Sequence, residues 1–466
     1  MILVNYIFRL SSRIHPFWIL SFIFIFAACG PQKKISAKAD RTEFYKKAPF
    51  NNAHVGIAVY DPSEHQWLHQ YQDDKYFVPA SNTKLFSLYA GLKYLGDSLT
   101  ALSWQETDSE LYLLPAGDPS FLHPDFPVQP AFQFLKKTNK KILIIDSNWK
   151  EEAWGEGWSW DDYNDDYMAE RSVFPIYGNT IRWIQEYQQQ DTSSVMASSN
   201  IFVYSLPEVD WKLRFNTDSS AGHFFVKRKL AENVYEVTEG PDKKAEQDVP
   251  FVTNGIQSAI ILLKDTLGSG HLISRASTED LSRLAKSNKH AFGQIRSRPV
   301  DSLYGPMMIR SDNFFAEQVL LMASQQRFGI MNDDSIINCI LSQELAGLPQ
   351  RPHWVDGSGL SRYNLFSPRD FVWILDQLRN EFGLDRMERL LPTGGTGTLR
   401  NYYKQDSGYI FAKTGSLSGV IALSGYLITK KNKVLIFSVL ANNYLGNGFE
   451  MRRAVEGFLH GIRESN

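Results

Sequence analysis

Strand-like patterns stand near both ends of this chain, and a stretch of different character separates them. An alternating strand pair begins at His54, and a three-strand pattern with a final helix fills residues 407–462. Between them, short β-like runs alternate with turn residues and a Trp-rich patch that also carries several Asp residues, at positions 154–167. This order predicts an α/β (α+β) body, residues 49–100 and 266–466, that is interrupted by a mostly β insertion at residues 101–265.

Composition places the chain among globular proteins and excludes some partners. Apolar residues make up 43% and charged residues 21%, values that a mostly disordered chain does not have. With 49 Lys and Arg against 51 Asp and Glu, the chain lacks the basic excess that neutralising nucleic-acid phosphates requires. The two cysteines, Cys29 and Cys339, match no zinc or redox spacing. We therefore expect a globular protein that does not bind nucleic acid.

The N-terminal segment resembles an export signal followed by a tether. Two arginines precede an apolar run at residues 17–26, which is shorter than the about 20 residues of a membrane-spanning helix. Small residues then lead to Cys29, as in the box where bacterial lipoproteins are cleaved and lipidated. We expect residues 1–29 to be a lipoprotein signal peptide and the polar residues 30–48 to be a tether. An uncleaved signal anchor is the alternative.

Several common catalytic patterns are missing from the sequence. It has no H-E-x-x-H zinc motif, no G-x-S-x-G nucleophile elbow and no G-x-x-x-x-G-K-[ST] phosphate loop. His65 and His69 are four residues apart, but they lie in a strand pattern, where that spacing builds no site. The Gly-rich run at residues 393–397 is expected to be a turn. We therefore expect neither a metal ion nor an organic cofactor.

Three short motifs remain that can carry chemistry. Ser81 and Lys84 form an S-x-x-K motif at the expected start of an amphipathic helix, so the hydroxyl and the amine share one face. A serine hydroxyl is a poor nucleophile until a base removes its proton, and a lysine becomes that base when burial or a neighbouring cation lowers its pKa. Ser311 and Asn313 form an S-x-N motif before a helix, and Lys413 opens a K-T-G motif. Each motif alone has a plain structural interpretation: a helix cap for the first two and a hairpin turn for the third.

Two of these motifs occur twice, and their context separates the copies. The second S-x-x-K, Ser147–Lys150, follows a strand pattern and has no helical face after it. The second S-x-N, Ser198–Asn200, leads into a strand pattern, and K-T-G occurs once. The set of three in this order is therefore much more specific than any one motif.

The three motifs together resemble the active-site set of serine β-lactamases and penicillin-binding proteins. The chain is similar to the low-molecular-weight class C group, the D-alanyl-D-alanine carboxypeptidase/endopeptidases of peptidase family S13, over nearly its whole mature length. The interval from Lys84 to Ser311 is far longer than in a compact β-lactamase, and this group inserts extra domains there. Further stretches that resemble the group are Gly117–Ser120, Gly157–Asp162, Arg310–Glu317, Asp356–Arg362 and Leu391–Leu399.

This resemblance implies a fold and an acyl-enzyme mechanism. The fold would be a penicillin-binding-protein domain with an antiparallel five-stranded sheet flanked by helices, in which the first and last segments meet. Ser81 would attack the carbonyl of the penultimate D-Ala, or that of a peptide cross-link, with Lys84 as its base. Ser311 would relay a proton to the leaving amine, and Lys413 would help to keep Lys84 neutral. Water would then release the acyl group.

The same resemblance assigns the substrate contacts. Asn313 would hold the backbone amide of the substrate, and the lysine of the K-T-G motif would bind the terminal carboxylate together with Thr414. Gly415 and Ser416 continue this substrate-binding strand. The backbone N–H groups of Ser81 and Ser416 would form the oxyanion hole.

The Trp-rich patch of the insertion carries two neighbouring carboxylates, Asp161 and Asp162. In the family this place reaches toward the side-chain amine of the substrate, so we expect Asp162 to bind substrate. A pair of solvated turn carboxylates is the alternative.

Other functions are compatible with the same residues. A β-lactamase or esterase of this fold would use the same acyl-serine, but the E-x-x-L-N segment of class A β-lactamases is absent, which favours a peptidase. A catalytically silent peptidoglycan-binding lipoprotein would not need Lys84 and Lys413 together. The expected partners are peptidoglycan peptides, β-lactams and, through a lipid on Cys29, a bacterial membrane. The expected location is the periplasm, on the outer rather than the inner membrane.

Overall fold

The computed structural model describes residues 44–46, 48–187, 201–216, 222–268, 270–286 and 292–466. The expected signal peptide, Cys29, most of the tether and the Ser198–Asn200 motif lie outside these residues. Within the described ranges, no helix combines the length and the apolarity that crossing a bilayer requires.

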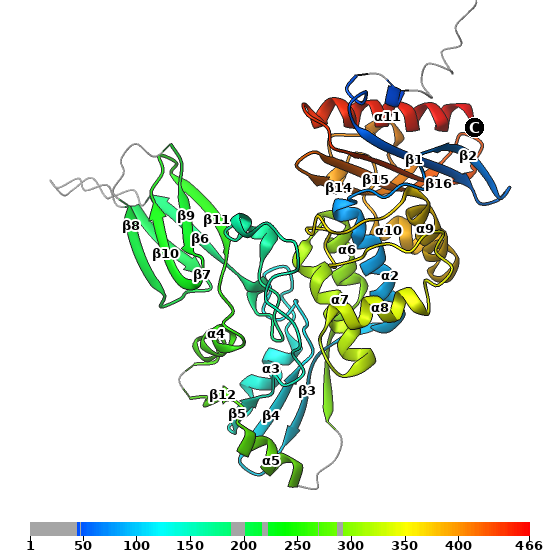
Figure 1. The fold of residues 1–466 in the computed structure, drawn as a ribbon. Helices are drawn as coiled ribbons and strands as arrows, with labels where there is room; N and C mark the ends of the chain where they lie inside the picture. The colour runs from blue at the N-terminus through cyan, green and yellow to red at the C-terminus, as the bar shows by residue number, and fades with distance from the viewer. Residues whose placement is uncertain (1–43, 47, 188–200, 217–221, 269, 287–291) are drawn as a thin grey trace, which may run out of the picture.

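Both ends of the chain meet in one five-stranded antiparallel sheet, the centre of the body (Figure 1). Its strand order is β14-β15-β16-β1-β2, so the first strand lies beside the last one, with His54 opposite Asn442. This arrangement confirms the predicted fold class. The strands are β1 (His54–Asp61), β2 (Gln66–Tyr71), β14 (Ile410–Leu417), β15 (Val420–Ile428) and β16 (Val434–Asn442).

Helices cover both faces of this sheet. Helix α11 packs on one face, and a helical layer that includes α2, α7 and α9 packs on the other. Because β15 is covered on both sides, every residue from Val420 to Leu427 is buried, and the strand reads as a nearly continuous apolar run. The helices of the body are α2 (Lys84–Tyr94), α6 (Asp301–Ile309), α7 (Asn313–Phe328), α8 (Asp333–Ser342), α9 (Pro368–Phe382), α10 (Leu384–Leu390) and α11 (Gly448–Ser465).

The insertion consists of two parts. The first is a five-stranded mixed sheet with the order β12-β5-β4-β3-β13, and the second contains two three-stranded sheets, β8-β10-β9 and β11-β6-β7. Its strands are β3 (Ser98–Glu106), β4 (Glu110–Pro115), β5 (Lys141–Ile144), β6 (Thr180–Tyr187), β7 (Ile201–Leu206), β8 (Lys212–Asn216), β9 (Phe225–Lys229), β10 (Glu232–Thr238), β11 (Lys244–Pro250), β12 (Ile273–Arg275) and β13 (Gly293–Pro299). Its helices are α3 (Pro130–Lys136), α4 (Gln257–Leu267) and α5 (Thr278–Lys286).

The predicted C-terminal boundary of the insertion, residue 265, is wrong. Strand β12 pairs with β5 and strand β13 pairs with β3, so the insertion continues to Pro299. Helix α5, which falls within the residues predicted for the body, lies between these two strands. Hydrophobic periodicity identifies the type of an element, whereas its partner in a sheet depends on long-range contacts.

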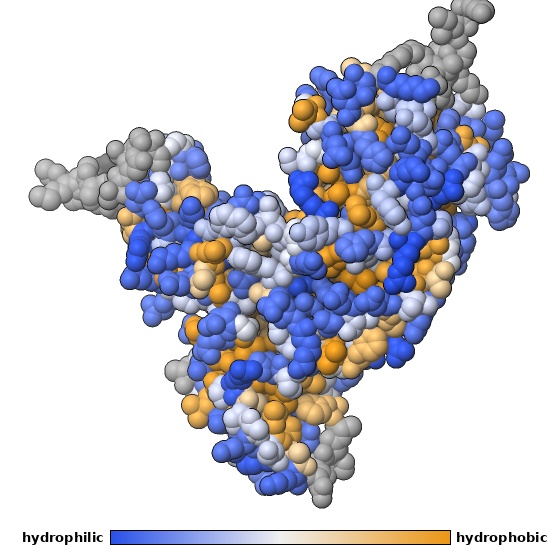
Figure 2. All heavy atoms as spheres, in the orientation of Figure 1, coloured by the Kyte–Doolittle hydropathy of each residue, from blue (hydrophilic) through white to orange (hydrophobic). Residues whose placement is uncertain are grey.

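The two parts of the insertion stand away from the body (Figures 1 and 2). The space-filling view shows a wide notch between the part that contains β6 to β11 and the body. The Trp-rich patch lies where the insertion joins the body. Trp158 of this patch donates a hydrogen bond to Asp356 of the body.

Candidate active site

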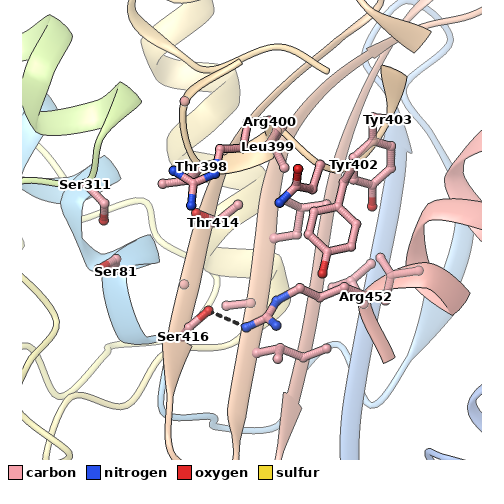
Figure 3. A pocket seen from close by; sticks show the side chains of 18 of the residues that line it. Ser81, Ser311, Thr398, Leu399, Arg400, Tyr402, Tyr403, Thr414, Ser416 and Arg452 are labelled. Atoms are coloured by element: carbon pink, nitrogen blue, oxygen red, sulfur yellow. Dashed lines mark hydrogen bonds between the residues drawn. The ribbon is translucent and has the colours of Figure 1, made fainter. Parts of the chain in front are cut away.

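The three sequence motifs meet beside strand β14, at one edge of the sheet. Ser81 lies on the short 3₁₀ turn η2 (Ala80–Thr83) that leads into α2. Ser311 lies in the loop between α6 and α7, and Lys413 lies on β14. The side chains of Ser81, Ser311 and Thr414 line one cavity of about 520 Å³ (Figure 3). The structure therefore joins residues from distant parts of the sequence into one site.

The buried amine of Lys84 contacts three oxygen atoms, and this arrangement directs its lone pair at Ser81. Nζ lies 3.0 Å from Ser81 Oγ, 2.5 Å from Asn313 Oδ1 and 2.7 Å from the Ser358 carbonyl oxygen. The amide and carbonyl oxygens only accept hydrogen bonds, whereas the hydroxyl can also donate one. A neutral amine therefore gives its two N–H groups to Asn313 and Ser358 and offers its lone pair to the Ser81 hydroxyl. This is the contact that a nucleophile and its base require.

Acylation of Ser81 should become faster as the pH rises. Burial lowers the pKa of Lys84 to about 8, while the carboxylates of Asp356 and Glu317 oppose this shift. Only the neutral amine can take the serine proton, so below this pKa the labelling rate with a fluorescent penicillin should rise about tenfold per pH unit. Above a pH of about 8 the rate should level off. A flat profile of labelling rates across this range would contradict Lys84 as the base.

The helix-cap interpretation fails for both serines. The N-cap of α2 is Thr83, and the N-cap of α7 is Asp312, whose carboxylate accepts a hydrogen bond from the Phe315 N–H at 2.9 Å. Ser311 instead has a left-handed backbone, with φ of 69°, and its Oγ accepts a hydrogen bond from Lys413 Nζ at 2.8 Å. A strained backbone at a non-glycine residue is typical of functional sites.

Lys413 is buried within strand β14, so the interpretation of its motif as an exposed hairpin turn is wrong. Its amine donates to Ser311 Oγ and to the Thr414 carbonyl oxygen, the latter at 2.9 Å. Burial, and then the charge of Lys84, lowers the pKa of Lys413 well below its usual value. The charge of Lys84 thus disfavours protonation of Lys413, while the reverse effect, Lys413 helping to keep Lys84 neutral, stays a prediction.

Two residues for which the sequence predicted no role, Ser358 and Glu317, help to position the amine of Lys84. The Ser358 N–H donates to Glu317 Oε1 at 2.7 Å, while the Ser358 carbonyl accepts from Lys84. Glu317 lies one turn after Asn313 on α7, so both side chains reach the same region. Burial raises the pKa of Glu317 to about 8, and Arg171 of the insertion lies 3.6 Å from its other carboxylate oxygen. A backbone carbonyl has no sequence signature, which is why this support was missed.

The loop that carries Ser358 is organised by one buried carboxylate. Asp356 accepts hydrogen bonds from the backbone N–H groups of Gly359 (2.8 Å) and Ser361 (2.7 Å). It also accepts one from Trp158 Nε1 at 3.0 Å, in the Trp-rich patch of the insertion. The insertion therefore helps to position the carbonyl group that binds Lys84. The stretch Asp356–Arg362 was recognised as similar to the family, but its role becomes visible only in the structure.

Gly359→Ala should disrupt the turn that carries Ser81. A Cβ atom on Gly359 would lie 1.9 Å from the carbonyl oxygen of Ala80, and Gly359 has φ of 83°, which an L side chain rarely adopts. We expect the free energy of unfolding to fall by about 2–4 kcal/mol, with loss of penicillin labelling. Thermal denaturation checks this, with Gly457→Ala as the control, because a Cβ on that helical glycine meets open space. An unchanged melting temperature and a normal labelling rate would contradict the prediction.

Thr414, Gly415 and Ser416 lie on the outer strand of the sheet. In the described part of the chain, no strand pairs with this outer edge of β14 at these three residues. Gly415 allows the turn of Ser81 to approach, because a Cβ atom there would lie 2.6 Å from the Pro79 carbonyl oxygen. Ser416 is exposed, and the oxyanion hole predicted from its N–H group and that of Ser81 stays a prediction.

Asp162 does not line the cavity that contains Ser81. It ends the 3₁₀ turn η3 (Trp160–Asp162). The same patch contacts the site through Tyr167, whose carbonyl oxygen accepts a hydrogen bond from Asn313 Nδ2 at 3.0 Å. The substrate contact of Asp162 stays a prediction. Cys339 is buried.

In this site, a serine is hydrogen-bonded to a lysine three residues later, and a second serine–lysine pair lies at the edge of the sheet. This arrangement defines a serine hydrolase of the serine–lysine type. The chain belongs to the D-Ala-D-Ala carboxypeptidase 3 (S13) family, whose profile matches residues 40–460. This confirms the family that the three motifs indicated.

Relatives and solved structures are similar over nearly the whole chain. The chain is 25% identical over 437 residues to the D-alanyl-D-alanine carboxypeptidase of Actinomadura sp. (strain R39), covering 84% of this chain and 78% of the relative. It is 22% identical over 454 residues to D-alanyl-D-alanine carboxypeptidase DacB of Haemophilus influenzae, covering 89% and 91%. The crystal structure of penicillin binding protein 4 (dacB) from Haemophilus influenzae superposes with a TM-score of 0.67, at 19% identity, over 91% of this chain and 98% of that one. This last likeness confirms the fold.

Proposed function

We propose that this enzyme is a serine D-alanyl-D-alanine carboxypeptidase/endopeptidase that acts on peptidoglycan stem peptides and their cross-links and is acylated by penicillin. The observation that carries this proposal is the contact between Ser81 Oγ and the Lys84 amine, whose other two partners are hydrogen-bond acceptors. Membership of the S13 family supports the substrate class.

The reaction begins when Ser81 Oγ attacks the carbonyl carbon of the scissile amide and its proton moves to Lys84. The C–N bond then breaks, and the proton passes through Ser311 to the leaving amine. Water hydrolyses the acyl-Ser81 ester and restores the serine. In this scheme Asn313 holds the substrate amide, and Lys413 with Thr414 holds the carboxylate.

Hydrolysis of a defined peptide tests the proposal. Purified protein comprising residues 30–466 should release D-alanine from diacetyl-L-lysyl-D-alanyl-D-alanine, and penicillin should stop this release. Rapid turnover of the chromogenic β-lactam nitrocefin without release of D-alanine would favour the β-lactamase alternative instead. A folded protein that neither reacts with penicillin nor releases D-alanine would favour the silent peptidoglycan-binding alternative.

We also propose that the chain is attached to a membrane through a lipid on Cys29 and faces the periplasm, on the outer rather than the inner membrane. The support is the short apolar run and the small residues before Cys29. Growth with an alkyne-tagged fatty acid should label the full chain, and Cys29→Ser should lose the label. Fractionation of the inner and outer membranes then locates the labelled protein, and label in the Cys29→Ser variant would contradict the attachment site.

A further inference from the structure

One buried cluster of charges extends from the insertion to the lysine that serves as the base. Its inner end is Glu317 on α7, whose Oε1 accepts a hydrogen bond from the Ser358 N–H at 2.7 Å, while the carbonyl group of Ser358 binds Lys84. Its outer end is Arg171 of the insertion, which lies 3.6 Å from Glu317 Oε2. Both side chains are buried, so water screens the interaction of their charges only weakly.

The side chain of Glu317 is poorly stabilised as an anion. Its Oε1 has a hydrogen-bond donor, but its Oε2 has none in the part of the chain that the structure describes. The nearest guanidinium nitrogen, Nη1 of Arg171, donates to Asp333 at 2.5 Å instead. A buried carboxylate with a single donor loses its hydration without full replacement, so a proton on it is favoured. Accordingly, burial raises the pKa of Glu317 to about 8.

The amine of Lys84 titrates in the same range. Burial lowers its pKa to about 8, while the charges of Asp356 and Glu317 act in the opposite direction. An ionised Glu317 therefore favours a protonated Lys84, whereas a protonated Glu317 leaves the amine neutral. The two arrangements hold the same number of protons, and only the second contains the base that Ser81 requires.

The charged groups around this pair come from several elements. They are Asp312 at the N-cap of α7, Asp356, Lys413 on β14, Asp333 on α8, and Arg171 with its partner Glu151 in the insertion. Among those that act on Glu317, Arg171 favours the ionised carboxylate, whereas Asp356 and Asp333 oppose it. The arginine of the insertion thus affects which of the two buried groups carries the proton.

We propose that Lys84 and Glu317 share one proton, and that Arg171 of the insertion favours the arrangement in which Glu317 is ionised and Lys84 is protonated. Glu317 and Arg171 are then positioning residues, which act on Ser81 through its base. This inference rests on the proposed acyl-Ser81 reaction. It gives the insertion a part in the chemistry, because Arg171 determines what fraction of the enzyme has a neutral base at neutral pH.

Glu317→Gln tests the shared proton, because glutamine keeps an oxygen atom for the Ser358 N–H but carries no charge. The midpoint of the pH profile for acylation by a fluorescent penicillin should move down by about one pH unit. At a pH of about 6, acylation should be about three- to tenfold faster than in the wild-type enzyme. Above a pH of about 8 it should be equal or up to about threefold slower, because a weaker base takes the proton less readily. The control is Glu236→Gln, at an exposed glutamate on β10, which should leave the profile unchanged.

Arg171→Gln tests the arginine of the insertion. The midpoint should move in the same direction, because Glu317 then holds the proton at neutral pH. Arg171→Lys retains the positive charge and should keep the wild-type midpoint. Arg171→Gln also leaves Asp333 without its partner, which lowers the free energy of unfolding, so circular dichroism first shows whether the variant is folded. If it is not folded, Glu317→Gln and Arg171→Lys carry the test.

A purely structural role gives a different result. If Glu317→Gln is acylated more slowly at every pH, or keeps the wild-type midpoint, the shared proton is overturned. An unchanged midpoint in folded Arg171→Gln, or a shifted midpoint in Arg171→Lys, would overturn the part assigned to the insertion. If the wild-type protein is not acylated by penicillin at any pH, the proposed function itself fails, and this result is distinct from the others.

Discussion

Ser81→Ala should abolish covalent labelling by a fluorescent penicillin and lower kcat for D-alanine release by about 10⁴-fold or more. Only the Oγ atom can form the acyl-enzyme, and it is the one oxygen beside the Lys84 amine that carries a transferable proton. The rest of the site stays in place, so weak non-covalent binding of the peptide should persist. Gel fluorescence and a D-alanine assay measure both effects.

The sequence offers a matched control for this variant. Ser147 is the serine of the second S-x-x-K motif, and both Ser147 and Lys150 are exposed. Ser147→Ala should label and hydrolyse like the wild-type enzyme. Labelling that survives in Ser81→Ala, or that disappears in Ser147→Ala, would show that the nucleophile has been assigned wrongly.

Lys84→Met should slow acylation by about 10²–10⁴-fold, the usual contribution of a general base. Methionine has a similar length and suits a buried position, but it has no lone pair that can accept the serine proton at neutral pH. The Asn313 and Ser358 oxygen atoms lose a donor, which lowers the free energy of unfolding by about 1–3 kcal/mol. Circular dichroism shows whether the variant is folded before its labelling rate is measured.

The pH profile distinguishes the base from a merely structural lysine. The residual labelling of Lys84→Met should no longer follow an ionisation with a pKa of about 8, whereas Lys150→Met should keep the wild-type profile. A variant that retains the wild-type rate would contradict Lys84 as the base. A variant that is slow but keeps the original pH profile would point to another group as the proton acceptor.

The sequence alone predicted the family, the fold class and the three motifs, because the motifs and the strand and helix patterns are local. The S-x-x-K spacing on a helix start, for example, is sufficient to place Ser81 beside Lys84. The resemblance to the family likewise implied that the first and last segments meet in one sheet, and the pairing of β1 with β16 confirms this.

Other parts of the site depend on contacts that no local pattern records. The Ser358 carbonyl binds Lys84 through its backbone, and any residue type has such a group. Arg452 follows a helix start in the sequence as an ordinary surface arginine would, and only the fold brings it to Ser416. The end of the insertion could not be predicted for the same reason. The three-residue strand β12 is identified as part of the insertion only by its pairing with β5.

The pairing of the first strand with the last has a consequence for the synthesis of the enzyme. Strand β1 lies between β2 and β16, so a ribosome must complete nearly the whole chain before β1 gains its second neighbour. Such contacts between distant segments form slowly, because the intervening chain must first be ordered. The K-T-G strand β14 is also made late, so a nascent chain that carries Ser81 has no active site. The catalytic centre is thus assembled only after strand β14 has been synthesised and has joined the sheet.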